Sequence, residues 1–219
     1  MPEDARAVLL AAVGHATQGV RDADVDAAYA ALERRYRRSG ESVEADRLER
    51  LCERLADYGV RVSRVRGEGV AKAVADWVEE RRVRSWVVPA GLEDAWLARV
   101  RDVRVVSDDA EPRVLDAADA VVTGCAVAVA ETGTIVLDGG PGQGRRAATL
   151  VPDAHLCVLR ASQVVDLVPE AIAVLEPAVR AGRPLTFVSG PSATSDIELV
   201  RVAGVHGPRT LAVVLIESP

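Results

Sequence analysis

Apolar residues recur along the chain at two spacings, one typical of helices and one typical of strands, and the two alternate from residue 42 to residue 106. Helical spacing predicts helices from Ser42 to Gly59, over Val70–Arg82 and over Glu93–Val100. Short β-branched runs predict the strands Val60–Val65, Ser85–Pro89 and Val103–Val106. This alternation favours parallel strands with helices on both faces of the sheet.

The second half of the chain has a different pattern, in which predicted strands follow one another through short turns. Connections this short favour antiparallel pairing, so we expect a mixed sheet. One further helix is predicted over Asp166–Val179, with Pro177 in a position to end it early. The predicted strands of this half are Ala117–Val122, Ala126–Ala130, Thr134–Asp138, His155–Leu159, Leu185–Val188 and Leu211–Ile216.

The first 42 residues form a separate helical arm in this interpretation, followed by an α/β domain over residues 43–219. Residues 2–16 have helical spacing, and residues 19–42 are rich in Asp and Arg. The basic run Arg34–Arg38 is compatible with a solvated helix face before a linker, or with docking on an acidic partner.

Composition narrows the classes of function. The 219 residues are 49% hydrophobic, enough for a sizeable core, and no apolar run is long enough to span a bilayer. The acidic start of the chain has no signal-peptide pattern, which favours a cytoplasmic protein. A net charge of −6 argues against nucleic acid as a partner. No aromatic residue lies between Trp96 and Phe187, so this half of the chain has no side chain that could stack on a flavin ring.

Metal chemistry has little support in the sequence. Cys52, Cys125 and Cys157 are far apart and form no C-x-x-C pair, so buried free thiols are the favoured interpretation. The three histidines lack ligand spacing. We therefore expect this chain to bind no cofactor or metal of its own.

The polar tetrad Glu131-Thr132-Gly133-Thr134 lies between two apolar β-branched segments. Such a tetrad forms either a tight turn with Gly133 at positive φ or a site presented at a sheet edge. Open α/β sheets bind ligands at strand ends, which supports the second alternative.

The glycine-rich loop Asp138–Ala147 resembles two nucleotide-binding motifs without completing either. It lacks the lysine and the Ser/Thr of a phosphate loop. The helix that follows is too short for a dinucleotide fingerprint. We favour a mobile loop in which Arg145 and Arg146 clamp an anion.

The segment Ser189–Asp196 follows a predicted strand and offers Gly190 and several hydroxyl groups. It is compatible with an anion-binding nest, with a helix N-cap at Thr194 or Ser195, or with both. A predicted turn at residues 204–208 presents His206. A triad of Ser192, His206 and Asp196 is conceivable, but no Gly-x-Ser-x-Gly elbow supports it.

Four stretches in this order resemble the LUD domain family, and within it the lactate utilisation protein C (LutC/YkgG) type. The resemblance is dense from about residue 115 to residue 216 and looser before it. The stretches are Thr123-Gly124-Cys125 with Ala130–Thr134, then Gly142–Arg146, then Val188–Glu198, then Gly204–Arg209.

The resemblance implies a three-layer α/β/α sandwich with a mixed, mostly parallel sheet, like the NagB/RpiA/CoA-transferase superfamily. It also implies a role in oxidising L-lactate to pyruvate, as one component of a system whose other subunits carry iron–sulfur clusters. This chain would then be a non-redox component with a site for a small carboxylate or phosphate and would bind neither nucleic acid nor a membrane, and a homo-oligomer is an open alternative.

On this basis we predict acid–base roles for Glu131 and His206. The predicted ligand-binding residues are Thr123, Gly124, Thr132, Gly133, Thr134, Arg145, Gly190, Ser192, Thr194 and Asp196. Two alternatives remain open. One is an independent enzyme of CoA-transferase or sugar-phosphate type that uses Glu131, and the other is a non-catalytic scaffold for iron–sulfur partners.

Overall fold

The computed structural model describes residues 5–19, 22–195, 201–204 and 206–218, without the side chains of residues 22, 193–195 and 201–203. The chain divides into two compact units, residues 1–37 and residues 38–219. The smaller unit contains α1 (Ala5–Ala16) and α2 (Asp22–Ala31). None of the side chains of α1 is buried, although its apolar residues have helical spacing.

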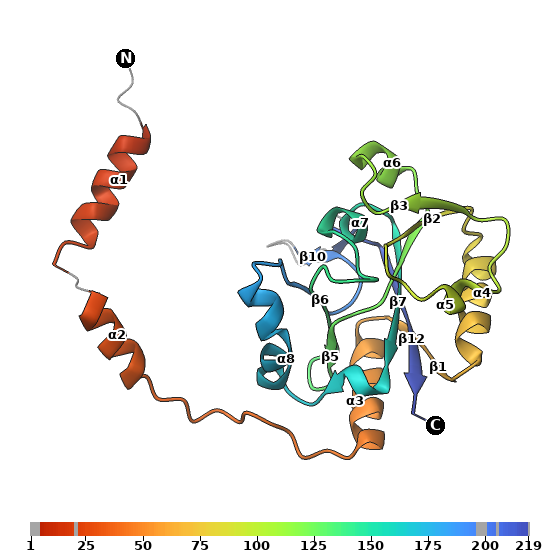
Figure 1. The fold of residues 1–219 in the computed structure, drawn as a ribbon, viewed down its shortest axis with the longest axis horizontal. Coiled ribbons are helices and arrows are strands. Elements are labelled where there is room, and N and C mark those ends of the chain that lie inside the picture. Colours follow the sequence, from red (N-terminus) through yellow and green to blue (C-terminus); the bar gives the residue numbers. More distant parts are fainter. Residues whose placement is uncertain (1–4, 20–21, 196–200, 205, 219) are drawn as a thin grey trace. The chain divides into compact units, whose positions relative to one another are not determined.

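The larger unit is built around a six-stranded, fully parallel sheet with the order β1-β12-β7-β4-β2-β3 (Figure 1). The central strands β7 and β12 are apolar over almost their whole length, as expected for parallel strands that are covered on both faces. The strands are β1 (Arg61–Arg66), β2 (Ser85–Val88), β3 (Arg104–Ser107), β4 (Ala120–Thr123), β7 (Ala154–Arg160) and β12 (Thr210–Glu217).

A second sheet has the order β8-β5-β6-β9, with β5 and β6 antiparallel. The predicted antiparallel pairing is therefore confirmed for β5 and β6, which form their own sheet and do not extend the parallel one. It is wrong for β4, which pairs in parallel with β2 and β7, because residues 124–126 lead the chain from the large sheet to the second one. Its strands are β5 (Val127–Val129), β6 (Thr134–Leu137), β8 (Val164–Val165) and β9 (Thr186–Val188). A separate two-stranded ribbon pairs β10 (Ala193–Ser195) with β11 (Arg201–Ala203).

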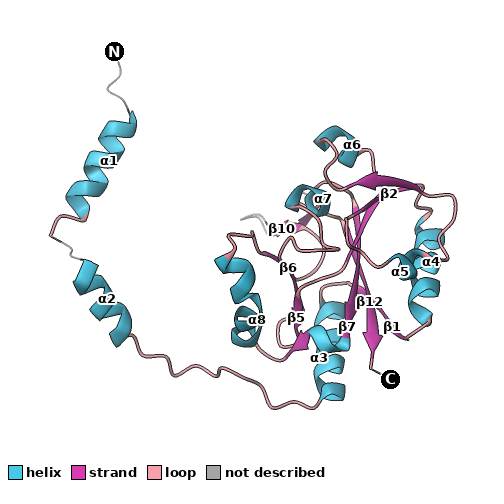
Figure 2. Ribbon diagram, viewed as in Figure 1, coloured by secondary structure: helices cyan, strands magenta, loops and turns pink. Residues whose placement is uncertain are grey.

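Helices cover both faces, which confirms the predicted α/β class (Figure 2). Apolar side chains of α4 (Gly69–Arg81) and α5 (Asp94–Leu97) pack on one face of the large sheet. On the other face, α3 (Glu44–Asp57) and the second sheet enclose a core with β7 and β12, while α6 (Pro112–Asp116) and α7 (Arg146–Leu150) cover β2 and β4. Helix α8 (Val168–Arg180) packs on the outer side of the second sheet.

One predicted detail is wrong, because Pro177 does not end the helix early. Helix α8 continues past Pro177 to Arg180, and the N–H of Ala181 still donates to the carbonyl of Pro177. Pro177 and Ala173 are exposed, so water can pair with the carbonyl that the proline leaves without a donor. Thr194 and Ser195 belong to strand β10, and the residues that a helix capped by them would occupy lie outside the described residues, so the cap stays a prediction.

Residues 40–42, which the sequence analysis grouped with the arm, contact the larger unit through Asp166. The backbone N–H of Ser42 donates to Asp166 Oδ2 at 3.2 Å, and a side chain on Gly40 would overlap that of Asp166. Arg47 and Arg50 of α3 form ion pairs with the same carboxylate, at 3.8 and 3.5 Å. Asp166, only 2% exposed, therefore fixes the segment that leads into α3.

Candidate functional site

A cavity of about 270 Å³ lies between the edge strand β9 of the second sheet and the first residues of β7 and β12 in the large sheet. His155 and Leu211, each the second residue of its strand, contribute to its wall. The cavity is thus at the amino-terminal end of these strands, whereas the sequence analysis expected a site at strand ends by analogy with open α/β sheets. The lining residues are Arg146, Thr149, His155, residues 186–192, residues 206–208 and Leu211.

His155 is a buried polar residue in an otherwise apolar strand. Alternation along β7 places it on the same face as Cys157 and Leu159, toward the second sheet. Its Nε2 lies 2.7 Å from Oγ1 of Thr123, whose side chain is fully buried at the end of β4. Burial, together with the nearby positive charge of Arg146, lowers the pKa of His155 to about 4. The imidazole is therefore neutral at physiological pH.

Arg146 and Thr149 enter the cavity from α7. The guanidinium Nη1 of Arg146 is 3.4 Å from Thr149 Oγ1, and that hydroxyl donates to the carbonyl of Arg146 at 3.2 Å. Within the described part of the chain, no carboxylate forms an ion pair with Arg146. Its positive charge is available to an anion beside a neutral imidazole.

A chain of hydroxyl groups connects the predicted tetrad to the cavity. Antiparallel pairing of β6 with β9 places Ile135 opposite Val188, so Thr134 comes next to Ser189. Their hydroxyl oxygens are 2.8 Å apart, and Thr132 Oγ1 lies 2.7 Å from Thr134 Oγ1. Only Ser189 lines the cavity, so Thr132 and Thr134 act on it through that residue.

Glu131 and Gly133 belong to a tight turn outside the lining. Gly133 has φ of +60°, which confirms the predicted turn, and a side chain there would collide with Arg54 of α3. Glu131 is exposed, and its backbone N–H donates to the carbonyl of Asp166 at 3.1 Å. The structure therefore does not place Glu131 among the residues that line the cavity.

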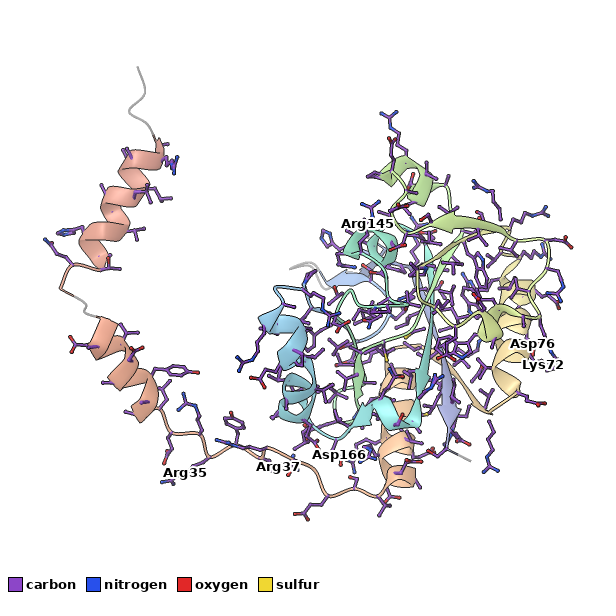
Figure 3. The ribbon with its side chains drawn as sticks, viewed as in Figure 1. Arg35, Arg37, Lys72, Asp76, Arg145 and Asp166 are labelled. Atoms are coloured by element: carbon purple, nitrogen blue, oxygen red, sulfur yellow. The ribbon has the colours of Figure 1, made fainter. Side chains whose placement is uncertain are left out.

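The two arginines predicted to clamp an anion point to different places. Arg145 Nε donates to the carbonyl of Asp108 at 2.6 Å, and its Nη2 donates to the carbonyl of Ala110. Arg146 lines the cavity, but Arg145 does not. Figure 3 shows Arg145 and Asp166 at opposite ends of the larger unit. Because the turn of Glu131 lies at the Asp166 end, the structure does not bring Glu131 and Arg145 together.

A second hollow of about 170 Å³ adjoins the first and shares Arg146, Thr149 and Thr186 with it. Arg145 and Arg183 also line this hollow, together with Gly139 and Gly144 of the glycine-rich loop. Its acidic residue is Asp138, which forms an ion pair with Arg183 at 2.9 Å and accepts the N–H of Gly140 at 2.9 Å. The side chain of Gln143 holds the loop by accepting the N–H of Asp138 at 2.7 Å.

Gly124 has a structural role in these contacts. Its N–H donates to the carbonyl of Gly142 at 2.8 Å, and the Cys157 thiol contacts its carbonyl at 3.6 Å. These contacts tie the end of β4 to the glycine-rich loop. Gly124 lines neither hollow.

Residues 189–192 and 206–208, from two of the predicted turns, form one wall of the cavity. Ser192 N–H donates to the carbonyl of Pro208, and Gly204 N–H donates to the carbonyl of Ser192, both at 2.8 Å. Gly190, at φ of +119°, packs against Tyr58 so closely that a side chain would collide with it. His206 is exposed at the cavity.

The conceivable triad has no support in this wall. Ser192 Oγ accepts the backbone N–H of His206 at 3.0 Å, so this hydroxyl contacts the backbone of His206 and not its imidazole. The side chain of Thr194 and the whole of Asp196 lie outside the described residues. Their predicted roles therefore stay predictions.

Sequence reasoning missed His155 and Thr149 as site residues and chose Arg145 over Arg146. The sequence did contain a signal for His155, which is a histidine within an apolar run. Polar residues are uncommon in buried strands, so such a residue is a candidate for a site. Among the residues described by the structure, no three or more His, Cys, Asp or Glu side chains group as metal ligands. Each helix in the same residues is too short or too polar to cross a bilayer.

Comparison with known proteins gives close relatives. The chain is 48% identical over 173 residues to "Lactate utilization protein C" of Deinococcus radiodurans, a match that covers 78% of this chain and 80% of that protein. It is 30% identical over 145 residues to "Lactate utilization protein C" of Geobacillus kaustophilus, covering 63% of this chain and only 60% of that relative.

A solved structure supports the fold. The crystal structure of a DUF162 family protein from Deinococcus radiodurans matches with a TM-score of 0.70 and 39% sequence identity, over 80% of this chain and 99% of that one. The sequence pattern of the LUD domain matches residues 48–216, which include both hollows. The chain therefore belongs to the LUD domain family.

Proposed function

We propose that this chain is a component of an L-lactate utilisation system and that its larger cavity binds a small carboxylate. The name of the 48% identical Deinococcus relative supports the first part. The observation that carries the second part is the guanidinium of Arg146, which has a hydroxyl but no carboxylate partner among the described residues, beside the neutral imidazole of His155.

The chemistry of the cavity suits a 2-hydroxy or 2-keto acid. A guanidinium pairs with a carboxylate through two parallel N–H donors. Ser189, Thr149 and the neutral His155 offer donors and acceptors for the neighbouring hydroxyl or carbonyl oxygen. His206, exposed in the same wall, is the proposed proton donor or acceptor. Glu131 takes no part in this proposal, because it lies outside the lining.

In this proposal, iron–sulfur subunits that act with this chain in the cytoplasm accept the electrons released when L-lactate is oxidised. The resemblance to the lactate utilisation protein C type supports that assignment. The chain's own three cysteines are distant in sequence and lack ligand spacing. A CoA-transferase role for Glu131 gains nothing from the geometry, since its turn is held against Asp166 and α3.

Calorimetric titration of the purified protein with L-lactate and pyruvate tests the site. Arg146→Gln should weaken binding about tenfold or more, the loss expected when a charge-assisted hydrogen bond is removed. Arg180→Gln on α8 is the matched control, because it removes the same charge from a side chain that is 78% exposed and lines neither hollow. Equal affinity in both variants, or no binding by the parent chain, would contradict the carboxylate site.

Growth tests the system-level role. A Deinococcus radiodurans strain lacking its lactate utilization protein C should recover growth on L-lactate when it receives this chain or the Arg180→Gln variant. The Arg146→Gln variant should not restore growth. If all three restore growth while binding stays undetectable, the scaffold alternative is favoured.

A further inference from the structure

The two hollows adjoin across Arg146, which, with Thr149 and Thr186, lines both. The larger hollow, of about 270 Å³, contains His155, and the smaller, of about 170 Å³, lies between the glycine-rich loop and Arg183. Because Arg146 borders both hollows, a ligand that pairs with it in the larger hollow can extend into the smaller one.

The charges in the pair of hollows do not balance. Arg183 is neutralised by Asp138 at 2.9 Å. Arg145 donates to two backbone carbonyls, and Arg146 contacts a hydroxyl. No carboxylate forms an ion pair with Arg145 or Arg146 within the described ranges. The combined site is thus suited to a ligand with two negative groups.

The volume supports the same conclusion. A lactate ion corresponds to about six water-sized groups, or roughly 180 Å³ at about 30 Å³ each. That is less than the larger hollow alone, and it leaves the smaller hollow without an occupant. A monocarboxylate the size of lactate therefore leaves the smaller hollow unfilled and gives the guanidinium of Arg145 no anion to pair with.

We infer that the two hollows form one elongated site for a small ligand with two anionic groups (here a dianion), a carboxylate at Arg146 and a second oxyanion group, phosphate or carboxylate, beside Arg145. The loop fits this task, since Gly139 and Gly144, at φ of +65° and +71°, line the smaller hollow with backbone atoms and without side chains. The planar donor forks of arginine suit either oxyanion. This inference rests on the proposed function, because it names the ligand class of the same cavity.

Matched pairs of ligands test it by calorimetry on the full chain. Phosphoenolpyruvate differs from pyruvate by a phosphate, and L-malate differs from L-lactate by a carboxylate. At least one dianion should bind about tenfold or more tightly than its monoanion, as one added charge-assisted contact predicts. The better pair identifies which oxyanion the smaller hollow accepts. Dianions that bind no more tightly than pyruvate and lactate would overturn the inference and leave the proposed function intact.

Variants locate the second group. Arg145→Gln should bring the ratio of dianion to monoanion affinity close to one, whereas Arg180→Gln should leave the ratio at its parent value. If Arg145→Gln does not fold, Asp138→Asn removes the negative charge from the same hollow, keeps an acceptor for the N–H of Gly140 and should raise the ratio. A ratio unchanged in the folded variant overturns the inference. If only the dianions bind, the proposal of a lactate-sized ligand is wrong and the elongated site is supported. If no ligand binds, both the proposed function of the cavity and the elongated site are wrong.

Discussion

Thr123 Oγ1 lies 2.7 Å from Nε2 of His155, and both side chains are buried between the large parallel sheet and the second sheet. The two residues come from adjacent parallel strands, β4 and β7, in which Val121 is the register partner of His155. This hydrogen bond fixes the imidazole that forms part of the cavity wall.

Replacing Thr123 with valine should destabilise the protein. The substitution keeps the shape of the side chain but leaves Nε2 without its partner in a buried site, at a cost of about 1–3 kcal/mol. Thr123→Ser retains the oxygen and should lose only about 1 kcal/mol for the missing methyl group. Urea unfolding measures both. A valine variant as stable as the serine variant would show that the hydrogen bond does not contribute.

The stability of the protein should fall as the pH is lowered from about 6.5 to about 4. His155 has a folded pKa of about 4, below its ordinary value of 6.5, because burial penalises the charged imidazole. In that window the unfolded chain binds a proton that the folded chain does not, so acid favours unfolding. The effect is about 3 kcal/mol when complete. His155→Gln should remove this part of the pH dependence in urea unfolding, and an unchanged profile would contradict the assignment.

Arg146→Gln should raise the pKa of His155 without restoring its ordinary value. The charge of Arg146 is the second cause of the lowered pKa, and burial, the larger cause, remains in the variant. NMR titration of the ring nitrogens measures the change. Arg180→Gln, which removes a charge on α8, should leave the pKa of His155 at its parent value; a shift of equal size in the control would mean that net charge, and not proximity, is responsible.

Asp166→Ala should loosen the segment that leads into α3. The buried carboxylate accepts the N–H of Ser42 and forms ion pairs with Arg47 and Arg50. Its loss should cost about 2–3 kcal/mol, in line with hydrogen bonds to charged groups. Limited proteolysis should then cut residues 38–43 faster than in the parent chain. Asp166→Asn, which keeps an acceptor, should show a smaller effect, and equal cleavage in all three chains would refute the role of this carboxylate.

The thiols should differ in reactivity with Ellman's reagent. Cys125 and Cys157 are buried, and the hydrogen bond that the Cys125 thiol donates to Cys157, together with burial, raises the pKa of Cys125 well above its ordinary value. Cys52 is partly exposed, although burial raises its pKa as well. We expect slow labelling of Cys52 alone in the native protein and labelling of all three thiols in guanidinium chloride. Cys52→Ser should abolish the native reaction.

Much of the fold follows from local sequence patterns. The alternation of strands and helices from Ser42 to residue 106 predicted parallel pairing, because strands joined by helices must cross over in the same direction. The short connections around Glu131 predicted antiparallel pairing, and the pairing of β5 with β6 confirms it. These features depend on spacing and turn residues, which are properties of neighbouring positions.

The same patterns did not separate the two sheets or choose between adjacent arginines. Strands β5 and β6 pair with β8 and β9, segments distant in sequence, so their sheet depends on long-range register. Arg145 precedes α7 and turns to carbonyls near residue 108, whereas Arg146 begins the helix and lines the cavity. Both side chains line the smaller hollow, but of the two only Arg146 reaches the larger one, and packing against other elements decides which hollow each side chain reaches.

The sequence by itself determined the α/β class, most of the core strands and the family to which the motifs belong. The tertiary structure alone decided that His155 is buried against Thr123 beside Arg146, and that Glu131 lies outside the cavity lining. The physical reason is that backbone pattern is set by local sterics and burial, whereas a site depends on which side chains of distant strands meet in the folded core.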